Sequence, residues 1–367
     1  MVHRDDYVTK LEHYRWYHLY GEGLPGDISH YHELKKLICN NYVIYSDGKF
    51  KTVRIWPREP IHMCADEEEY RKTVHQIAET MKSNLGLIAQ KWARPAVSVT
   101  GGRDSKGSLA ASIHVKEKYQ YFSYNSQPAE KVDCDAAEAI CKAVGVPHIT
   151  YEIPLDKSVY PEYDLVRAIL CVNSNRRYFN HNDIMKRIYL RKANPFDIEA
   201  KSWTSEIGRA FYYKRYGVRH MQKKCTARRV NAMNNIFLMN PALMYATDAR
   251  YRDYLRSTAY NEHMFNYDWS DIIDLEMRDS RWGADVLSCE HMFSHDVTVP
   301  YNNRHLSDLM LMVPLADRIA DRTHVDFTHE LCPAIDATNI SVKDVAHNNK
   351  RMWMDKIYYF ITSIRPF

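Results

Sequence analysis

The sequence lacks several features that would place the chain in a well-marked class. No stretch approaches about 20 consecutive apolar residues, and the first six residues have no apolar core, so we expect neither a membrane-spanning helix nor a signal peptide. The eight cysteines include no C-x-x-C pair, and the 18 histidines include no H-E-x-x-H pattern. This spacing argues against a zinc site and predicts reduced, mostly buried thiols in a cytoplasmic protein.

An excess of charge of one sign is also lacking. The 50 basic and 46 acidic residues give a net charge of +4, which is too small and too mixed to indicate nucleic-acid binding. The basic runs at 176–177 and 223–229 are typical of a solvated face, and polyanion binding is the minority interpretation. With 367 residues and 45% hydrophobic composition, the chain can fold as two packed regions or as one large domain with an appendage.

Local patterns divide the chain into three segments. Residues 1–65 form an N-terminal appendage with a β-hairpin, whose strands are joined by Ser46-Asp47-Gly48. Residues 66–160 form an α/β core: a helix over 66–92, then strands 96–99, 120–124 and 148–153 alternating with helices 105–116 and 133–144. This alternation predicts a parallel sheet. Residues 161–367 are expected to be mostly helical, over 163–171, 181–191, 205–216, 236–245, 249–265, 269–282 and 306–311.

One turn in the core has chemical features beyond a simple connection. In "PAVSVTGGRDSKGSLAA", residues 95–111, an apolar strand ends at Gly101-Gly102 and a helix follows. The backbone N–H groups and the helix dipole at such a turn favour an anion. Thr100 and Ser105 add hydroxyls, and the Asp104 carboxylate suits a Mg²⁺ ion that bridges two phosphates. A tight loop capped by Asp104 or Ser105 remains the alternative.

The turn resembles the pyrophosphate loop of the ATP pyrophosphatase superfamily, whose hallmark S-G-G-x-D-S follows a strand. The sequence Thr100-Gly101-Gly102-Arg103-Asp104-Ser105 keeps this pattern, with Thr in place of the leading Ser. Flanking segments resemble asparagine-synthetase-like proteins: 30–57 the connector, 135–148 the helix after the second strand, 202–217 an acidic motif, and 275–283 with 299–314 later parts of the domain. The resemblance implies a PP-loop nucleotide-binding core of the HUP-like kind over roughly residues 30–345.

The resemblance also implies roles for individual residues. Asp104 and Glu206, which falls on the acidic position of the motif, would hold Mg²⁺ against the phosphates of ATP. Tyr124 and Asn125 would bind adenine through the end of their strand. The expected phosphate cradle consists of Val99, Thr100, Gly101, Gly102, Arg103, Asp104 and Ser105. The implied reaction is attack of a substrate carboxylate on the α-phosphate to give an acyl-adenylate, followed by attack of an amine or ammonia to give an amide.

The residue that stabilises the α-phosphate remains open. The family uses a late lysine for this purpose, and Lys343, Lys350 and Arg322 are candidates here. Glu276 is a further candidate catalytic residue, with a structural ion pair as its alternative. The sequence departs from the family pattern at residues 203–205, where relatives have glycines, and at 302–303, where asparagine synthetases have an aspartate.

The substrates are less constrained than the nucleotide. The N-terminal cysteine of a glutaminase domain is replaced by Val2, and about 60 residues before the core are too few for that domain. We therefore expect nitrogen from ammonia, from a substrate amine or from a separate glutaminase, and a small-molecule or peptide carboxylate in a specialised biosynthetic pathway. A nucleobase- or nucleic-acid-modifying PP-loop enzyme and a non-catalytic nucleotide-binding subunit are the alternatives. The sequence leaves the oligomeric state open.

Overall fold

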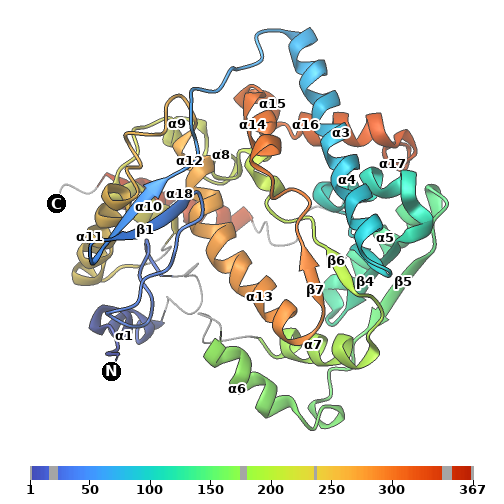
Figure 1. Ribbon diagram of the computed structural model, residues 1–367, viewed down its shortest axis with the longest axis horizontal. Helices are drawn as coiled ribbons and strands as arrows, with labels where there is room; N and C mark the ends of the chain where they lie inside the picture. Colours follow the sequence, from blue (N-terminus) through green and yellow to red (C-terminus); the bar gives the residue numbers. More distant parts are fainter. Residues whose placement is uncertain (1, 16–23, 174–179, 235–237, 341–348, 365–367) are drawn as a thin grey trace. The chain divides into compact units, whose positions relative to one another are not determined.

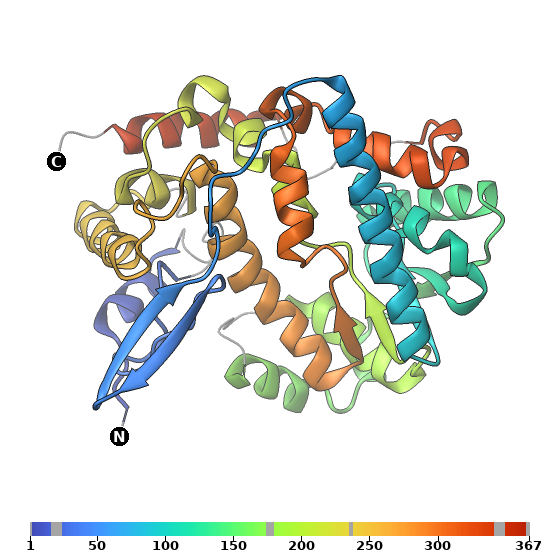
Figure 2. The ribbon, with the colours of Figure 1, turned by 45° about the horizontal axis from the view of Figure 1, so that its top comes forward.

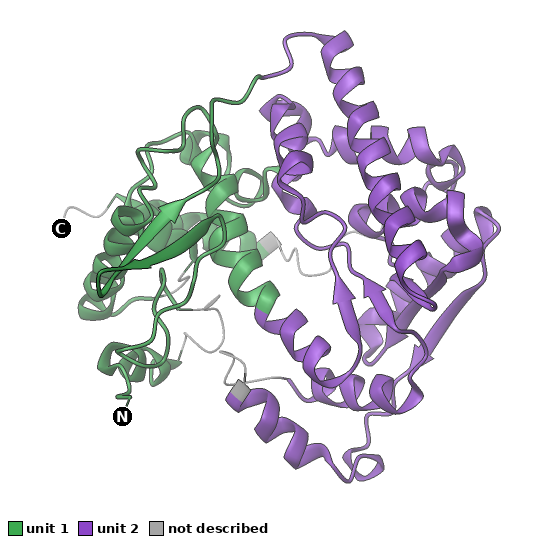
Figure 3. Ribbon diagram, in the orientation of Figure 1, with its two compact units in different colours: residues 1–62, 210–284, 348–367 green, residues 63–209, 285–347 purple. Residues whose placement is uncertain are grey.

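A computed structural model describes residues 2–15, 24–173, 180–234, 238–340 and 349–364 (Figures 1 and 2). The chain divides into two compact units (Figure 3). Unit 1 contains Met1–His62, Ala210–Ala284 and Asn348–Phe367, and unit 2 contains Met63–Arg209 and Asp285–His347. These units differ from the three consecutive segments 1–65, 66–160 and 161–367, because each unit combines stretches that are distant in sequence.

Unit 2 is an α/β structure built on a five-stranded parallel sheet. The strands are β3 (Pro95–Ser98), β4 (Gln120–Asn125), β5 (His148–Glu152), β6 (Ile198–Ala200) and β7 (Asp296–Thr298), in the order β5-β4-β3-β6-β7. The prediction of a parallel α/β core is confirmed. Strands β6 and β7 were not predicted, because three residues are too few to show a periodicity.

Helices cover both faces of this sheet. Helices α4 (Arg103–Ser112) and α5 (Lys131–Ala143) are the crossover connections from β3 through β4 to β5. The hydroxyls of Tyr121 and Ser112 lie 2.9 Å apart, which turns Tyr121 toward α4. The next residue, Phe122, points the other way and packs with Leu190 of α7 (His181–Ala193). Burial on both faces explains why the strands read as continuous apolar runs.

A long helix and its neighbours complete unit 2. Helix α3 (Glu67–Lys91) begins after Asp66, whose side chain accepts a hydrogen bond from Glu69 N–H, so the expected helix over 66–92 is confirmed. It packs against α4, α14 (Arg304–Met312) and α16 (Arg322–Leu331). The other helices are α6 (Tyr163–Asn173), α13 (Ala284–Phe293), α15 (Leu315–Ile319) and α17 (Pro333–Ala337). Short 3-10 turns occur at η1 (Ile113–Lys118), η2 (Pro128–Glu130), η3 (Lys157–Val159) and η4 (Ser205–Arg209).

Unit 1 combines a hairpin with helices. Strands β1 (Asn41–Ser46) and β2 (Lys49–Arg54) pair in antiparallel fashion, and Asp47 and Gly48 have φ angles of 52° and 75°, so the predicted tight turn is confirmed. The helices are α1 (Asp6–Glu12), α8 (Phe211–Tyr216), α9 (Val218–Met221), α10 (Ala227–Asn234), α11 (Pro241–Ser257), α12 (Trp269–Ile273), its π-helical continuation η5 (Asp274–Gly283), and α18 (Asn349–Ser363). Helix α1 packs on α11, and α10 packs on α11 and α18.

Three helix predictions in the second half of the chain were wrong. The helix expected over 205–216 is broken, because Ala210 adopts a left-handed φ of 49° between η4 and α8. The helices expected over 236–245 and 249–265 are replaced by α11, which ends at Ser257. The eight cysteines are free thiols, six of them buried, as predicted. Among the described residues, no helix combines the length and apolar character needed to cross a membrane.

Candidate functional site at the carboxyl end of β3

The strand order brings two segments to one edge of the sheet. Residues 99–105 follow β3 and lead into α4, and the turn η4 follows β6. Strands β3 and β6 are parallel neighbours, so their carboxyl ends lie side by side. The chain runs from β3 through β4 to β5 in one direction and then returns to place β6 on the other side of β3. In open α/β sheets such a reversal of strand order marks the usual position of a ligand crevice.

Hydrogen bonds within the loop hold it in a defined shape. The N–H of Thr100 donates to Ser105 Oγ over 3.0 Å, and the N–H of Gly102 donates to Thr100 Oγ1 over 3.1 Å. The N–H of Gly101 donates to Asp133 Oδ1, 3.2 Å away on α5. Just before the loop, Val99 N–H donates to the Phe122 carbonyl over 2.8 Å and extends the pairing of β3 with β4. The hydroxyls of Thr100 and Ser105 therefore support the loop.

Helix α4 begins in the middle of this loop. Gly102 is its N-cap, which places the N–H groups of the first turn, residues 103–105, at the edge of the sheet. These N–H groups have no acceptor within their own helix, and the helix dipole adds positive potential there. Lys106, in the same turn, donates to the Ile340 carbonyl, and burial together with Arg103 lowers its pKa. The loop thus fits a phosphate or another anion.

Close packing fixes the first turn of α4 in place. Gly107 lies against α16 and the segment after β7: an added Cβ would come within 2.4 Å of Tyr301 Oη and 2.6 Å of Phe327 Cζ. The Tyr301 hydroxyl in turn donates to the Asp104 carbonyl over 2.9 Å. The position of Asp104 therefore depends on residues almost 200 positions later in the chain.

The carboxylate of Asp104 is held by residues of η4. Nη1 of Arg209 lies 2.8 and 2.9 Å from the two oxygens of Asp104. The Ser205 hydroxyl donates to Asp104 Oδ1 over 2.5 Å. Because the guanidinium cation of Arg209 contacts both oxygens, its charge opposes a Mg²⁺ ion on the same carboxylate. The described contacts of Asp104 are those of an ion pair, which disagrees with the metal role that the resemblance implies.

A second carboxylate holds the other side of the same guanidinium. Nε of Arg209 donates to Asp321 Oδ1 over 2.8 Å, and Nη2 donates to Asp321 Oδ2 over 3.3 Å. Nε of Arg103 lies 3.4 Å from Asp321 Oδ2. Burial opposes the charge of Arg209, but Asp104, Asp321 and Glu206 outweigh it and raise its pKa above the usual value. The charge of Glu206 thus acts on the same guanidinium as that of Asp104. The two acidic residues expected at the site therefore both lie near Arg209.

The expected adenine strand ends beside the loop. The ring of Tyr124 faces the ammonium of Lys186, 4.0 Å from the ring centroid. The side chain of Asn125 donates to Glu152 Oε2 over 2.9 Å, and its carbonyl accepts from Ile153 N–H. Both residues lie at the carboxyl end of β4, the neighbour of β3. The structure therefore brings Tyr124 and Asn125 to the same edge as the loop.

Each of the other candidate catalytic residues is already paired, belongs to unit 1 or falls outside the described residues. Nη2 of Arg322 lies 2.7 and 2.8 Å from the carboxylate oxygens of Glu67 on α3, so its guanidinium is already paired. Lys343 lies outside the described residues, and Lys350 is an exposed residue of α18 in unit 1. Glu276 belongs to unit 1 as well, where its carboxylate is enclosed in the core.

The buried environment of Glu276 is that of a structural ion pair. Nη1 of Arg54 lies 2.5 Å from Glu276 Oε1, and Nη2 lies 3.1 Å from Oε2. The side chain of Asn40 donates to Oε1 over 2.8 Å, and the Tyr254 hydroxyl donates to Oε2. The side chains of Arg54 and Glu276 are 1% and 0% exposed. These contacts support the structural alternative for Glu276 over a catalytic role.

Sequence reasoning missed a cluster of buried charged side chains in and around β6. Nζ of Lys201 lies 3.0 Å from Glu199 Oε2 and 3.3 Å from Glu290 Oε2, and His295 Nε2 lies 2.8 Å from Glu199 Oε2. Glu199, Glu290 and His295 are close enough to hold a metal ion, but the ammonium of Lys201 lies between the two carboxylates. Burial opposes ionisation of Glu199, yet Lys201 and His295 lower its pKa. Charged residues inside the apolar strand "IEAK" were the available signal.

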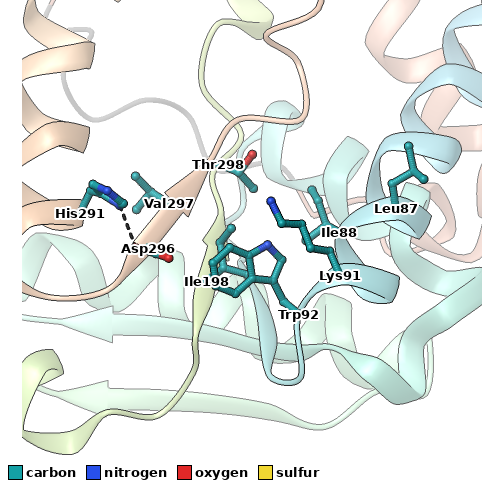
Figure 4. Close-up of a pocket in the computed structure, with 9 residues that line it drawn as sticks. All are labelled: Leu87, Ile88, Lys91, Trp92, Ile198, His291, Asp296, Val297 and Thr298. Atoms are coloured by element: carbon teal, nitrogen blue, oxygen red, sulfur yellow. Dashed lines mark ion pairs between the residues drawn. The ribbon is translucent and has the colours of Figure 1, made fainter.

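Two cavities are lined by residues outside the loop. One, of about 320 Å³ and open to solvent, is lined by the end of α3, β6 and β7, with Lys91, Trp92 and Thr298 in its wall (Figure 4). The other, of about 400 Å³ in unit 1, is lined by Arg228, Arg229 and Arg252. The described residues that line these cavities include none of the residues expected at the nucleotide site.

Comparison with known proteins adds no further assignment. The sequence matches no protein-family model, and no curated protein matches it.

Proposed function

We propose that the chain is an ATP-dependent, AMP-forming ligase that joins a carboxylate to an amine or to ammonia. The observation that carries this proposal is the position of the T-G-G-R-D-S loop. It connects β3 to the start of α4 at the point where the strand order reverses, with η4 of the neighbouring strand beside it. This is the place where open α/β sheets bind nucleotides, and the loop resembles a pyrophosphate loop with Thr100 in place of the leading Ser.

In the proposed reaction, a carboxylate oxygen of the substrate attacks the α-phosphorus of ATP. The bond to the β-phosphate breaks, pyrophosphate leaves, and an acyl-adenylate remains. The amine nitrogen then attacks the acyl carbon, AMP leaves with the bonding electron pair, and the nitrogen loses a proton. The N–H groups of the first turn of α4, with Arg103 and Lys106, would hold the phosphates, and the end of β4 at Tyr124 and Asn125 would receive adenine. In this proposal Mg²⁺ contacts the phosphates of the nucleotide during the chemical step and is not required for the nucleotide to bind.

The decisive experiment measures pyrophosphate release from ATP in the presence of a panel of carboxylic acids. Hydroxylamine serves as a small nucleophile that traps any acyl-adenylate as a hydroxamate. We expect pyrophosphate and AMP in equal amounts, dependent on one class of acid. Formation of ADP and phosphate would contradict the proposal.

A matched pair of variants tests whether the loop before α4 binds the phosphates of ATP. Lys106→Met removes the ammonium in the first turn of α4, whereas Lys118→Met removes an exposed ammonium at the end of η1. The first should raise the KM for ATP several-fold, and the second should leave it unchanged. Equal effects of the two substitutions would exclude the loop as the phosphate site.

The basic cavity of unit 1 favours one alternative, a nucleic-acid-modifying PP-loop enzyme. Three arginines, Arg228, Arg229 and Arg252, line this cavity beside the start of α10. Such a surface would bind a phosphate backbone with an affinity that falls steeply as salt increases. Titration with a labelled oligonucleotide at several salt concentrations distinguishes this alternative. Nucleotide binding without pyrophosphate release would instead indicate a non-catalytic subunit.

A further inference from the structure

We propose that Arg209 is the built-in cation of the loop and takes, on Asp104, the place that the resemblance gives to a metal ion. ATP binding at the loop then needs no Mg²⁺ ion coordinated by Asp104. This inference rests on the proposed nucleotide site. A metal site would need carboxylate oxygens directed at the ion. The oxygens of Asp104 instead accept hydrogen bonds from Ser205 and Arg209, and the inference starts from this difference.

The guanidinium of Arg209 lies between two carboxylates. Nη1 contacts both oxygens of Asp104 on α4, and Nε with Nη2 contacts both oxygens of Asp321, the residue before α16. All three side chains are mostly buried, at 22%, 24% and 16% exposure. The contact with Asp321 uses two nitrogens on two oxygens, and such charge-assisted pairs are among the strongest hydrogen bonds in proteins. Arg209 therefore joins the loop to α16 as a bridging metal ion would.

A magnesium ion would need the oxygens that Arg209 now occupies. Mg²⁺ requires an octahedral set of oxygens at about 2.0–2.1 Å, with carboxylate lone pairs directed at the ion. The Asp104 oxygens instead accept hydrogen bonds from Arg209 and Ser205. A guanidinium also matches the geometry of phosphate oxygens, so it can share its charge with a nucleotide. Because its pKa is raised, Arg209 keeps this charge throughout the physiological pH range.

The backbone around Arg209 is held in unusual conformations. Thr204 and Ala210, which flank η4, have φ angles of 66° and 49°, and Asp321 has 60°. Left-handed backbone is unfavourable for residues other than glycine. In addition, an added Cβ at Gly208 would lie 2.9 Å from Met310 Sδ on α14, which shows how tightly η4 is packed. Arg209 is thus placed by a rigid turn.

The test measures binding of α,β-methylene-ATP, which cannot release pyrophosphate, to the full-length protein by calorimetry. Titrations are done in excess EDTA and in excess Mg²⁺. For the wild-type protein we expect dissociation constants within about threefold of each other. For Arg209→Gln we expect binding at least tenfold weaker in EDTA and recovered by Mg²⁺, because Asp104 is then free to coordinate the ion. Arg209→Lys, which keeps the charge, should recover part of the binding in EDTA.

The control variant is Arg94→Gln. Arg94 makes a similar pair with Asp197, with Nη2 2.7 Å from Oδ1, at the opposite ends of the same two strands. Arg94→Gln should bind α,β-methylene-ATP as the wild-type protein does, both in EDTA and in Mg²⁺.

The outcomes separate this inference from the proposed function. Wild-type binding that disappears in EDTA overturns the role of Arg209 but leaves the nucleotide site standing, and this result needs no variant to fold. Absence of nucleotide binding in both conditions overturns the proposed function and the inference with it.

Discussion

Replacing Glu276 by glutamine separates the two roles that the sequence left open for this residue. The substitution keeps the size of the side chain and removes its charge. In the structure, Glu276 faces the guanidinium of Arg54 at 2.5 and 3.1 Å, and Asn40 and Tyr254 also donate to it. The Arg54 side chain is only 1% exposed, so Glu276→Gln leaves a buried cation without its anion.

The size of the effect follows from that burial. Removing one partner of a buried ion pair costs about 3–5 kcal/mol of folding free energy, whereas replacing both partners by apolar residues is often close to neutral. Burial opposes the charge of Arg54, and Glu276 more than compensates, since the pKa of Arg54 is raised. Arg54 therefore cannot escape the cost by losing its proton. We expect Glu276→Gln and Arg54→Met to be destabilising by about 3–5 kcal/mol each.

The assay is urea unfolding followed by tryptophan fluorescence and circular dichroism. The double variant Arg54→Met with Glu276→Gln should be clearly more stable than the sum of the two single effects predicts, because neither charge remains buried. A Glu276→Gln variant within about 1 kcal/mol of the wild-type stability, yet without pyrophosphate release, would refute the structural assignment and restore the catalytic one.

Two further predictions concern packing and charge in unit 2. Gly107→Ala places a Cβ 2.4 Å from Tyr301 Oη and should lower the unfolding free energy by about 1–3 kcal/mol in urea; an unchanged midpoint would contradict the packing. Lys201→Met leaves Glu199 and Glu290 buried without their shared ammonium and should cost about 3–5 kcal/mol. The pKa of Glu199 is lower in the folded protein than its ordinary value of 4.5. Ionised Glu199 therefore stabilises the fold fully above pH 4.5, and this contribution is lost as the pH falls below that value. Urea midpoints below pH 4.5 should fall more steeply for wild type than for Lys201→Met, and equal slopes would contradict this assignment.

Much of the fold could be predicted because its signals are local. The Asp-Gly turn of the hairpin and the capped start of α3 depend on a few neighbouring residues, and both are confirmed. Strands β6 and β7 depend instead on their neighbours in the sheet. Each has three residues, and Glu199 in β6 is fully buried, where Lys201 and His295 pair with its carboxylate. No local pattern distinguishes such a strand from a loop.

The candidate site shows the same division. The loop at Thr100–Ser105 was found from the sequence, because a strand, two glycines and a helix start follow one another. The partner of Asp104 could not be found, because Arg209 reaches it through the pairing of β3 with β6. The break at Ala210 also depends on distant packing. Glu206 was expected as the acidic ligand, and three positions later its motif carries Arg209, the cation that Asp104 binds.

The two ends of strands β3 and β6 offer a comparison within the same pair of strands. At the amino end, Arg94 pairs with Asp197, and the nearby left-handed residue is Asn194, a type that tolerates this conformation. At the carboxyl end, Arg209 pairs with Asp104, and the left-handed residues are Thr204 and Ala210, which tolerate it poorly. Both ends join the strands through an Arg–Asp pair, so joining the strands does not require the strained backbone. Left-handed backbone at residues that tolerate it poorly clusters at functional sites, which supports the proposal that the functional edge of this sheet lies at the loop.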